Sequence, residues 1–410
     1  MLPAPAVAQE LLYLGRALWG IALDAAPAQP PAFDGLRIFV VLRDGTVRAV
    51  DHASGATRWS APVSSIVELA ASGRVVAGAD DSAAWGLDAG TGRALWRRSL
   101  GAKAAAAPVA SEPGALFVTE AADLVLLAWD DGHESWRIRL PARLSAPLAS
   151  AGGTAYVGLD DGRVMAVKLS DGSIEWIRQL PAAVLVLTPL GDRVVAGSGD
   201  NYLYALRARD GKLSWRWRTG GDIVGQAAGD GRRVYFVSMD AMLRALDAGN
   251  GTLRWQRPLR SRPIGGPLLA GELLILAGVS PELQAFRISD GGTVASTPVP
   301  GRALQGLYLA KATDTAPVRV VLLTAGGRLL AVGEGVDPDL VPLDTVPGTP
   351  LAEEAPPELV WEPDLVPINV IPGTLLPPEV LPVIRRPPPT PARPQSPSSG
   401  GRASGMRSGR

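Results

Sequence analysis

The feature that constrains this chain most is a glycine followed four residues later by a tryptophan, which recurs about every 40 residues. Seven tryptophans occupy this position: Trp19, Trp59, Trp96, Trp136, Trp176, Trp215 and Trp255. Their successive spacings are 40, 37, 40, 40, 39 and 40 residues, and one further step of 40 reaches Ala295 in a segment that otherwise matches. A fixed period of this length indicates an internal repeat, so the chain contains eight copies of one structural unit.

Each copy has the pattern of four short strands. A β-branched run such as "RVVAGS" (193–198) is followed by a small and an apolar residue, as in Ala205-Leu206, and then by the glycine and the tryptophan. Asp-Gly and Asn-Gly pairs between these segments tolerate the positive φ of tight turns. Four strands in about 40 residues, repeated eight times, predict an all-β fold: an eight-bladed β-propeller with four-stranded antiparallel blades. A solenoid is the alternative architecture, but it would need capping units at its ends.

The two ends of the repeat complement each other. The last copy stops at "RLLAVGEG" (328–335), before its glycine–tryptophan strand, whereas the first such strand, residues 15–23, has no strands before it. We therefore predict that the N-terminal strand completes the eighth blade and closes the ring, which removes an exposed sheet edge. This assigns residues 1–14 to a leader or signal-peptide remnant, residues 15–335 to the propeller and residues 336–410 to a C-terminal tail.

The regular spacing of the tryptophans bears on their role. Aromatic side chains can bind ligands, but one tryptophan per blade, always four residues after a glycine, indicates packing against the neighbouring blade. A buried indole removes roughly 150–250 Å² from water, so this packing contributes strongly to stability.

Two segments of the chain carry a family resemblance. "DGRVMAVKLSDGSIEWIRQL" (161–180) and "GDNYLYALRARDGKLSWRW" (199–217) resemble the repeat of the pyrroloquinoline-quinone-like (PQQ-like) β-propeller family. The resemblance covers residues 15–335 and implies the propeller fold. Members of this family range from quinoprotein dehydrogenases to scaffolds without activity, so the resemblance does not fix the function. In size and blade number the chain is most similar to the propeller lipoproteins of outer-membrane β-barrel assembly, but it has no cysteine to accept a lipid and it has a long tail.

The residues argue against catalysis. The resemblance implies that a quinoprotein dehydrogenase would need a calcium site of acidic and amide side chains, a catalytic aspartate and an adjacent cysteine pair, and this chain has no cysteine. Its two histidines, His52 and His133, are too few for a metal cluster or a catalytic triad. Asp-Asp pairs such as Asp80/Asp81 recur with the repeat and are read as turn caps. We therefore expect no cofactor, metal or catalytic residue; a periplasmic PQQ-dependent dehydrogenase or a quinone-cofactor sensor is the alternative.

Charge is balanced overall and uneven locally. Forty basic and forty acidic residues give no net charge, so we expect no nucleic-acid partner. Between Arg207 and Arg262 the sequence has eleven arginines and Lys212 but only five aspartates. The candidate docking face formed by this excess consists of Arg216, Arg218, Arg257, Arg260 and Arg262. Ordinary exposed positions on outer strands are the alternative explanation.

The tail holds 18 of the 37 prolines, and such a density predicts an extended, largely disordered segment. Four variants of a motif with proline, an acid and two aliphatic residues occur in it. The aliphatic pairs are Leu340/Val341, Leu359/Val360, Leu365/Val366 and Val380/Leu381. We predict that they are short docking motifs whose repetition raises apparent affinity, and a solvated spacer is the alternative.

The sequence contains no stretch long and apolar enough for a transmembrane segment. Its start, "MLPAPAVAQE", resembles the end of a signal peptide, which predicts export if the assigned start truncates the leader. The expectation is thus a monomeric, non-catalytic scaffold in the periplasm or cell envelope. It would bind protein partners, including envelope or outer-membrane assembly components. A cytoplasmic interaction module is the alternative if the assigned start is correct.

Overall fold

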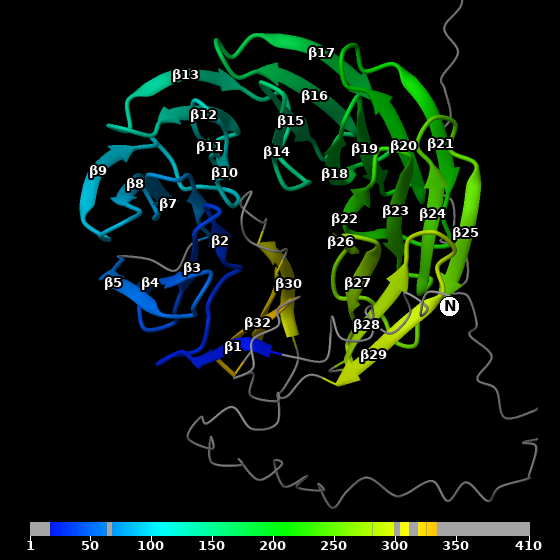
Figure 1. Ribbon diagram of the computed structural model, residues 1–410. Coiled ribbons are helices and arrows are strands. Elements are labelled where there is room, and N and C mark those ends of the chain that lie inside the picture. The colour runs from blue at the N-terminus through cyan, green and yellow to red at the C-terminus, as the bar shows by residue number, and fades with distance from the viewer. Residues whose placement is uncertain are drawn as a thin grey trace, which may run out of the picture. The chain divides into compact units, whose positions relative to one another are not determined.

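The computed structural model describes residues 17–63, 68–280, 282–298, 304–310, 319–324 and 326–333. All regular elements in these ranges are strands, which form eight four-stranded antiparallel sheets arranged in a ring (Figure 1). The predicted eight-bladed β-propeller is therefore confirmed. The four aliphatic pairs of the tail lie outside the described residues.

Blades one to four follow each other along the chain, each with its first strand nearest the centre of the ring (Figure 1). Blade one consists of β2 (Ala32–Phe33), β3 (Arg37–Val41), β4 (Thr46–Asp51) and β5 (Thr57–Pro62). Blade two consists of β6 (Ala70–Ala71), β7 (Val75–Ala79), β8 (Ala83–Asp88) and β9 (Ala94–Ser99). Blade three consists of β10 (Val109–Ala110), β11 (Gly114–Val118), β12 (Asp123–Ala128) and β13 (Glu134–Arg139). Blade four consists of β14 (Ala149–Ala151), β15 (Thr154–Gly158), β16 (Arg163–Lys168) and β17 (Ile174–Gln179).

Blades five to seven repeat this order. Blade five consists of β18 (Val184–Leu190), β19 (Arg193–Ser198), β20 (Tyr202–Arg207) and β21 (Leu213–Arg218). Blade six consists of β22 (Ile223–Gly229), β23 (Arg233–Ser238), β24 (Met242–Asp247) and β25 (Leu253–Pro258). Blade seven consists of β26 (Leu268–Ala270), β27 (Leu273–Ala277), β28 (Glu282–Arg287) and β29 (Thr293–Pro298).

The eighth blade joins the two ends of the repeat. Its first three strands are β30 (Leu304–Ala310), β31 (Arg319–Thr324) and β32 (Arg328–Gly333), and its outer strand is β1 (Ala17–Ala22). β1 pairs antiparallel with β32, with Trp19 opposite Ala331 and Ile21 opposite Leu329. The predicted closure of the ring by the N-terminal strand is thus confirmed, and the pairing covers the edge that β32 would otherwise expose.

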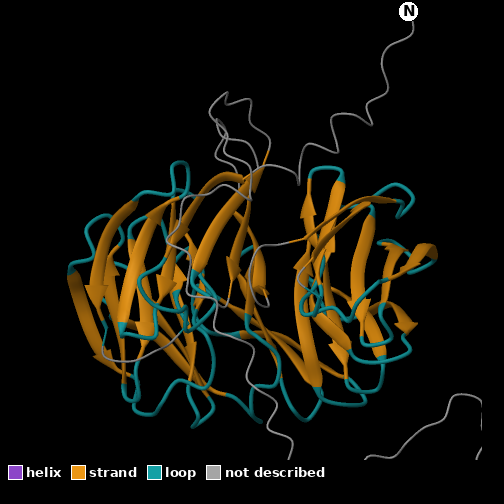
Figure 2. Ribbon diagram, turned by 90° about the horizontal axis from the view of Figure 1, so that it is seen from below, coloured by secondary structure: helices purple, strands orange, loops and turns teal. Residues whose placement is uncertain are grey.

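Turns and loops gather at the two rims of the ring (Figure 2). We call one rim the long-loop face: it carries the turns between second and third strands and the loops that lead from one blade to the next. Backbone hydrogen bonds join the two kinds of segment, as from Leu100 N to Ser82 O at 3.0 Å and from Leu140 N to Ala122 O at 2.8 Å. The opposite rim, called the turn face, carries the other two turns of blades one to seven, between first and second strands and between third and fourth strands.

The core lies between blades. The middle strands are buried on both sides, as β15 shows over its whole length, whereas the outer strand β17 buries only Trp176. One buried cluster combines Leu116 and Leu126 of blade three with Ala155 and Val157 of blade four. Each blade therefore completes its core only when its neighbour is present, which makes the ring the unit of stability.

The seven repeat tryptophans occupy equivalent positions at these interfaces. Six of them are 7–9% exposed and Trp19 is half-buried. Each indole N–H donates a hydrogen bond to a backbone carbonyl of the next blade, as from Trp136 Nε1 to Leu169 O at 2.7 Å. Each ring also covers the glycine in the last turn of the next blade, as Trp136 covers Gly172.

Ala295 stands at the eighth position, on the outer strand that faces blade eight. In seven blades the covered glycine lies in the turn between the third and fourth strands. In blade eight these strands are β32 and β1, which come from opposite ends of the repeat and have no connecting turn. The equivalent glycine of blade eight, four residues before Trp19, is Gly15, which lies outside the described residues.

Candidate functional site

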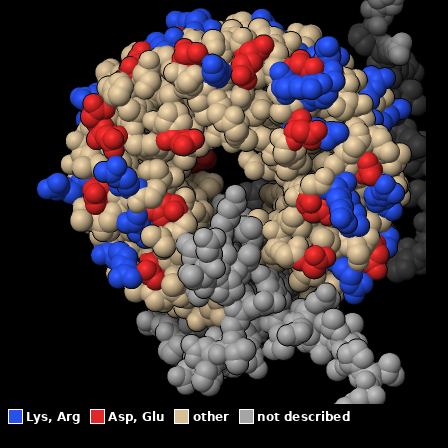
Figure 3. Space-filling model, turned by 45° about the horizontal axis from the view of Figure 1, so that its top comes forward, with Lys and Arg blue, Asp and Glu red and all other residues tan. Residues whose placement is uncertain are grey.

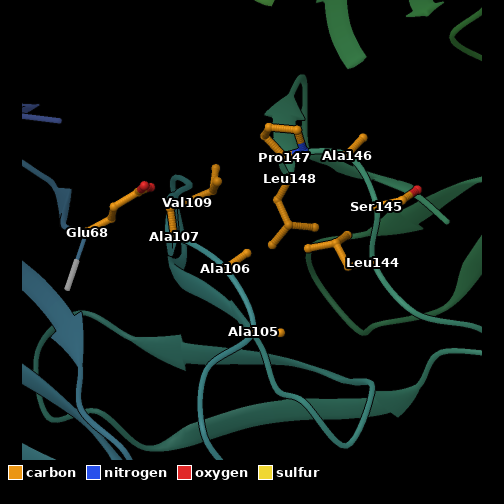
Figure 4. A pocket seen from close by; sticks show the side chains of 10 residues that line it. All are labelled: Glu68, Ala105, Ala106, Ala107, Val109, Leu144, Ser145, Ala146, Pro147 and Leu148. Atoms are coloured by element: carbon orange, nitrogen blue, oxygen red, sulfur yellow. The ribbon is translucent and has the colours of Figure 1, made fainter. Parts of the chain in front are cut away.

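The long-loop face is hollowed beside the first strands of blades three and four. The hollow has a volume of about 320 Å³. Ten residues line it: Glu68, Ala105, Ala106, Ala107, Val109, Leu144, Ser145, Ala146, Pro147 and Leu148. Figure 4 shows that two loops, the one before β10 and the one before β14, form most of its wall, with Glu68 on another side. Most of these side chains are small or apolar.

Backbone hydrogen bonds hold the two loops in place. Ala105 N donates to Val118 O at 2.7 Å, and Ser145 N donates to Gly158 O at 2.9 Å, so each loop is tied to the second strand of its own blade. The Ser145 hydroxyl donates to Val184 O at 2.7 Å and thereby links the second loop to blade five. A binding site tied down in this way is formed before its ligand arrives, which reduces the entropic cost of binding.

Glu68 is the one ionisable side chain of the hollow. Figure 4 shows its carboxylate turned toward Val109. Removal of this half-buried carboxyl from water raises its pKa. Within the described residues Glu68 forms no ion pair, so a cation from a bound molecule could pair with it. An apolar hollow with a single carboxylate suits an apolar side chain that lies next to a lysine or an arginine.

Acidic and basic side chains are interspersed on the side of the ring that Figure 3 shows. Many arginines of the basic stretch are paired, including Arg207 with Asp210 at 3.1 Å and Arg244 with Asp240 at 2.6 Å. The local excess of positive charge in the sequence is therefore partly neutralised in the fold.

The five candidate arginines do not form a single surface. Arg257 donates through Nη2 to the carbonyl of Asp290 at 2.5 Å, on the turn face of blade seven. The Arg216 guanidinium lies over the Tyr202 ring, 5.1 Å from its centroid, and Arg218 is exposed at the end of β21. Arg260 and Arg262 are both exposed in the loop between β25 and β26, on the long-loop face. Of the five candidate arginines, only Arg260 and Arg262 therefore lie in the same loop.

The donors that a quinone cofactor with calcium requires are not assembled here. No group of three or more histidine, cysteine or acidic side chains converges within the described residues. Asn201 has a φ of 63° in the turn before β20, and the Asn250 carboxamide oxygen accepts the N–H of Thr252 at 3.0 Å. Asp80 caps its turn by accepting the N–H of Ala83 at 3.0 Å and pairs with Arg97 at 2.5 Å. These side chains serve the turns, so the residues present do not fit the cofactor.

The sequence analysis did not identify the hollow, although the two loops that line it share a sequence feature. The inter-blade loop Ala104–Ala107 consists of four alanines before Pro108, and "LSAP" (144–147) precedes β14 at the equivalent place. Small residues in a loop are common, so only the fold shows that these two loops are neighbours. No helix among the described residues is long and apolar enough to cross a membrane.

Fold and site together define a PQQ-like eight-bladed propeller with a preformed, largely apolar hollow on its long-loop face. The family model described as outer membrane protein assembly factor BamB matches residues 12–126, 86–190 and 186–354. These matches span most of the propeller and most of the chain, and the chain belongs to this family.

Curated relatives carry the same description. The outer membrane protein assembly factor BamB of Yersinia pestis is 28% identical over 302 residues, which cover 66% of this chain and 76% of the relative. That of Nitrosomonas eutropha is 32% identical over 181 residues, which cover 42% of this chain and 43% of the relative.

Solved structures show the same fold. The crystal structure of BamB from Moraxella catarrhalis superposes with a TM-score of 0.65 at 18% identity, covering 78% of this chain and all of that one. Sqt1 of Saccharomyces cerevisiae superposes with a TM-score of 0.67 at 10% identity, covering 78% of this chain and 99% of that one. At these identities the superpositions support the propeller fold alone.

Proposed function

We propose that this protein is a non-catalytic scaffold of outer-membrane protein assembly that acts in the periplasm or cell envelope as a monomer and binds protein partners. Membership of the BamB family supports this, because its relatives are outer-membrane protein assembly factors. The fold is compatible with such a role, since a rigid ring presents two rims of loops while its blades stay unchanged.

The observation that carries the proposal is the hollow between the loops before β10 and β14. It is preformed and mostly apolar, and its one carboxylate lacks an ionic partner among the described residues. A partner segment with an apolar side chain next to a basic one would bury the first and pair the second with Glu68.

Replacement of Pro147 and Glu68 tests this site. In the double variant Pro147→Asp/Glu68→Gln, we expect recovery of outer-membrane assembly proteins from an envelope extract to fall about tenfold, because a charge enters the hollow and the pairing carboxylate is lost. Pro147 is exposed and Glu68 half-buried, so the melting temperature should change little. The matched control is Glu112→Gln, an exposed residue in the turn between β10 and β11 on the turn face. Equal recovery with the unchanged protein, the double variant and the control variant would contradict the proposed site.

The tail adds a second proposal. We expect serine at Leu340, Val341, Leu359, Val360, Leu365, Val366, Val380 and Leu381 to reduce partner recovery and to alter the protease sensitivity of the tail, because the aliphatic pairs would no longer be buried in a partner. Pull-down and limited proteolysis of the full chain measure the two effects. If both stay as in the unchanged protein, the tail is a spacer.

The absence of catalysis is part of the proposal and has its own test. Addition of pyrroloquinoline quinone with Ca²⁺ is expected to leave the melting temperature unchanged, because a ligand stabilises a protein only if it binds the folded state. No dye reduction with alcohols should follow. Differential scanning fluorimetry measures the first quantity, and a concentration-dependent rise in melting temperature would favour the quinoprotein alternative.

A further inference from the structure

The long-loop face carries a second feature, over blades six and seven and separate from the hollow. Among the described residues nine large apolar side chains are exposed, and three of them lie on this face: Met239 at 45%, Ile264 at 38% and Val279 at 61%. The other six lie in the turn before β3 or in outer strands. Scattered apolar residues are normal on a surface, whereas a local group of them indicates a contact site.

Hydrogen bonds show that these three residues are neighbours. Val279 N donates to Arg262 O at 2.9 Å, and Ile264 N donates to Ala277 O at 3.2 Å, so the loop before β26 lies along the end of β27. Arg262 Nη2 approaches Met239 Sδ at 3.3 Å and joins this loop to blade six. Three apolar side chains and an arginine thus form one continuous surface.

The backbone below this surface is tightly packed. Gly266, in the same loop, lies so close to blade six that an added Cβ would stand 1.9 Å from the carbonyl oxygen of Gln226. The loop is therefore held against both blades, and a partner would meet a fixed surface rather than one that must first be ordered.

The charge on this surface is basic. Arg260 and Arg262 are exposed and form no ion pair within the described part of the chain. The nearby carboxylate of Asp240 is already occupied by Arg244 at 2.6 Å, while Asp222 adds one exposed acid. Two unpaired guanidinium groups beside apolar side chains complement a carboxylate next to aliphatic residues.

We infer that the surface formed by Met239, Arg260, Arg262, Ile264 and Val279 binds an extended acidic peptide segment of a partner protein. Its aliphatic side chains would pack on Met239, Ile264 and Val279, while its carboxylates pair with the two arginines. This binding is independent of the hollow, so the ring would hold two partner segments on one face. A probe with the required chemistry is available in "VDPDLVPLDT" (336–345).

The test uses the full chain with the eight serine substitutions in its tail, so that its own motifs do not compete with the probe. By fluorescence anisotropy, the labelled synthetic peptide 336–345 should bind with a Kd on the order of 100 μM at low salt. Affinity should fall about tenfold in Arg260→Ala/Arg262→Ala and several-fold in Val279→Ser, and it should rise in Asp222→Asn. The control Arg209→Ala/Arg232→Ala removes two exposed arginines from the turn face and should leave affinity unchanged.

Four results would overturn the inference, the last of them a loss of peptide binding in the hollow variant. One is no anisotropy change up to about 1 mM protein, the weak limit of specific binding. Another is that Arg260→Ala/Arg262→Ala and Val279→Ser bind the peptide with the same affinity as the protein that keeps these three residues. The third is a dimer in sedimentation velocity that Val279→Ser dissociates, since the surface would then bind a second copy of this chain. Loss of peptide binding in Pro147→Asp/Glu68→Gln would assign the peptide to the hollow, whereas failure of the hollow in the pull-down leaves this prediction intact.

Discussion

Removal of residues 1–23 is expected to abolish cooperative unfolding and to produce aggregation. The truncated chain loses β1, which pairs with β32 over Trp19–Ala22 and packs on a buried cluster with Ile38, Val321 and Leu329. Three large apolar side chains of this cluster, Trp19, Ile21 and Leu23, are lost together with the inter-blade hydrogen bond from Trp19 Nε1 to His52 O at 3.0 Å. We estimate the loss at roughly 5 kcal/mol or more, comparable with the stability of a whole domain.

The exposed edge of β32 adds the tendency to aggregate, because its unpaired N–H and C=O groups can pair with another chain. Thermal melting followed by circular dichroism and light scattering measures both effects. A variant that lacks only residues 1–9 serves as the control and should melt like the full chain. Addition of a synthetic peptide of residues 15–23 should restore solubility in part. If the chain 24–410 is as soluble and as stable as the full protein, β1 does not stabilise the ring.

Most of the fold could be predicted from the sequence because the propeller is a repeat. A glycine–tryptophan pair in seven of the eight copies, at a period of about 40 residues, predicts the strand order of the blades, and the mismatch between the two ends predicts the closure. Ala295 departs from the pattern, and it faces the one blade whose third and fourth strands, β32 and β1, come from opposite ends of the repeat.

The candidate sites were less accessible to prediction, because each depends on which loops meet in space. The hollow combines Glu68 with two loops, at residues 105–109 and 144–148, and nothing in the local sequence states that these segments converge. The arginines were identified by their density in the sequence, but density does not separate Arg257, which is bound to Asp290 O, from Arg260 and Arg262 on the opposite face. Met239 and Val279 could be assigned to one surface only from hydrogen bonds between loops of two blades.

Trp136→Ala is the second change for which a large effect is expected. The indole is 9% exposed, lies between blades three and four, and donates to Leu169 O at 2.7 Å. Its removal leaves a cavity in a core shared by two blades, and we expect a loss of about 3–5 kcal/mol in the free energy of unfolding. Urea denaturation followed by circular dichroism measures it. Trp361→Ala in the tail is a matched control for the loss of a tryptophan and should leave the urea midpoint unchanged.

A double-mutant cycle with Gly172 tests the contact itself. Gly172 has a φ of +72°, and a Cβ added there would lie 2.8 Å from Cδ2 of Trp136. Gly172→Ala should therefore destabilise the protein through backbone strain of about 1–2 kcal/mol and, in addition, through a clash with the indole. In the Trp136→Ala background the clash is absent while the strain remains, so the second substitution should cost less, with a coupling energy of about 1 kcal/mol or more. Strict additivity of the two losses would show that the indole does not pack on this glycine and would contradict the packing role of Trp136.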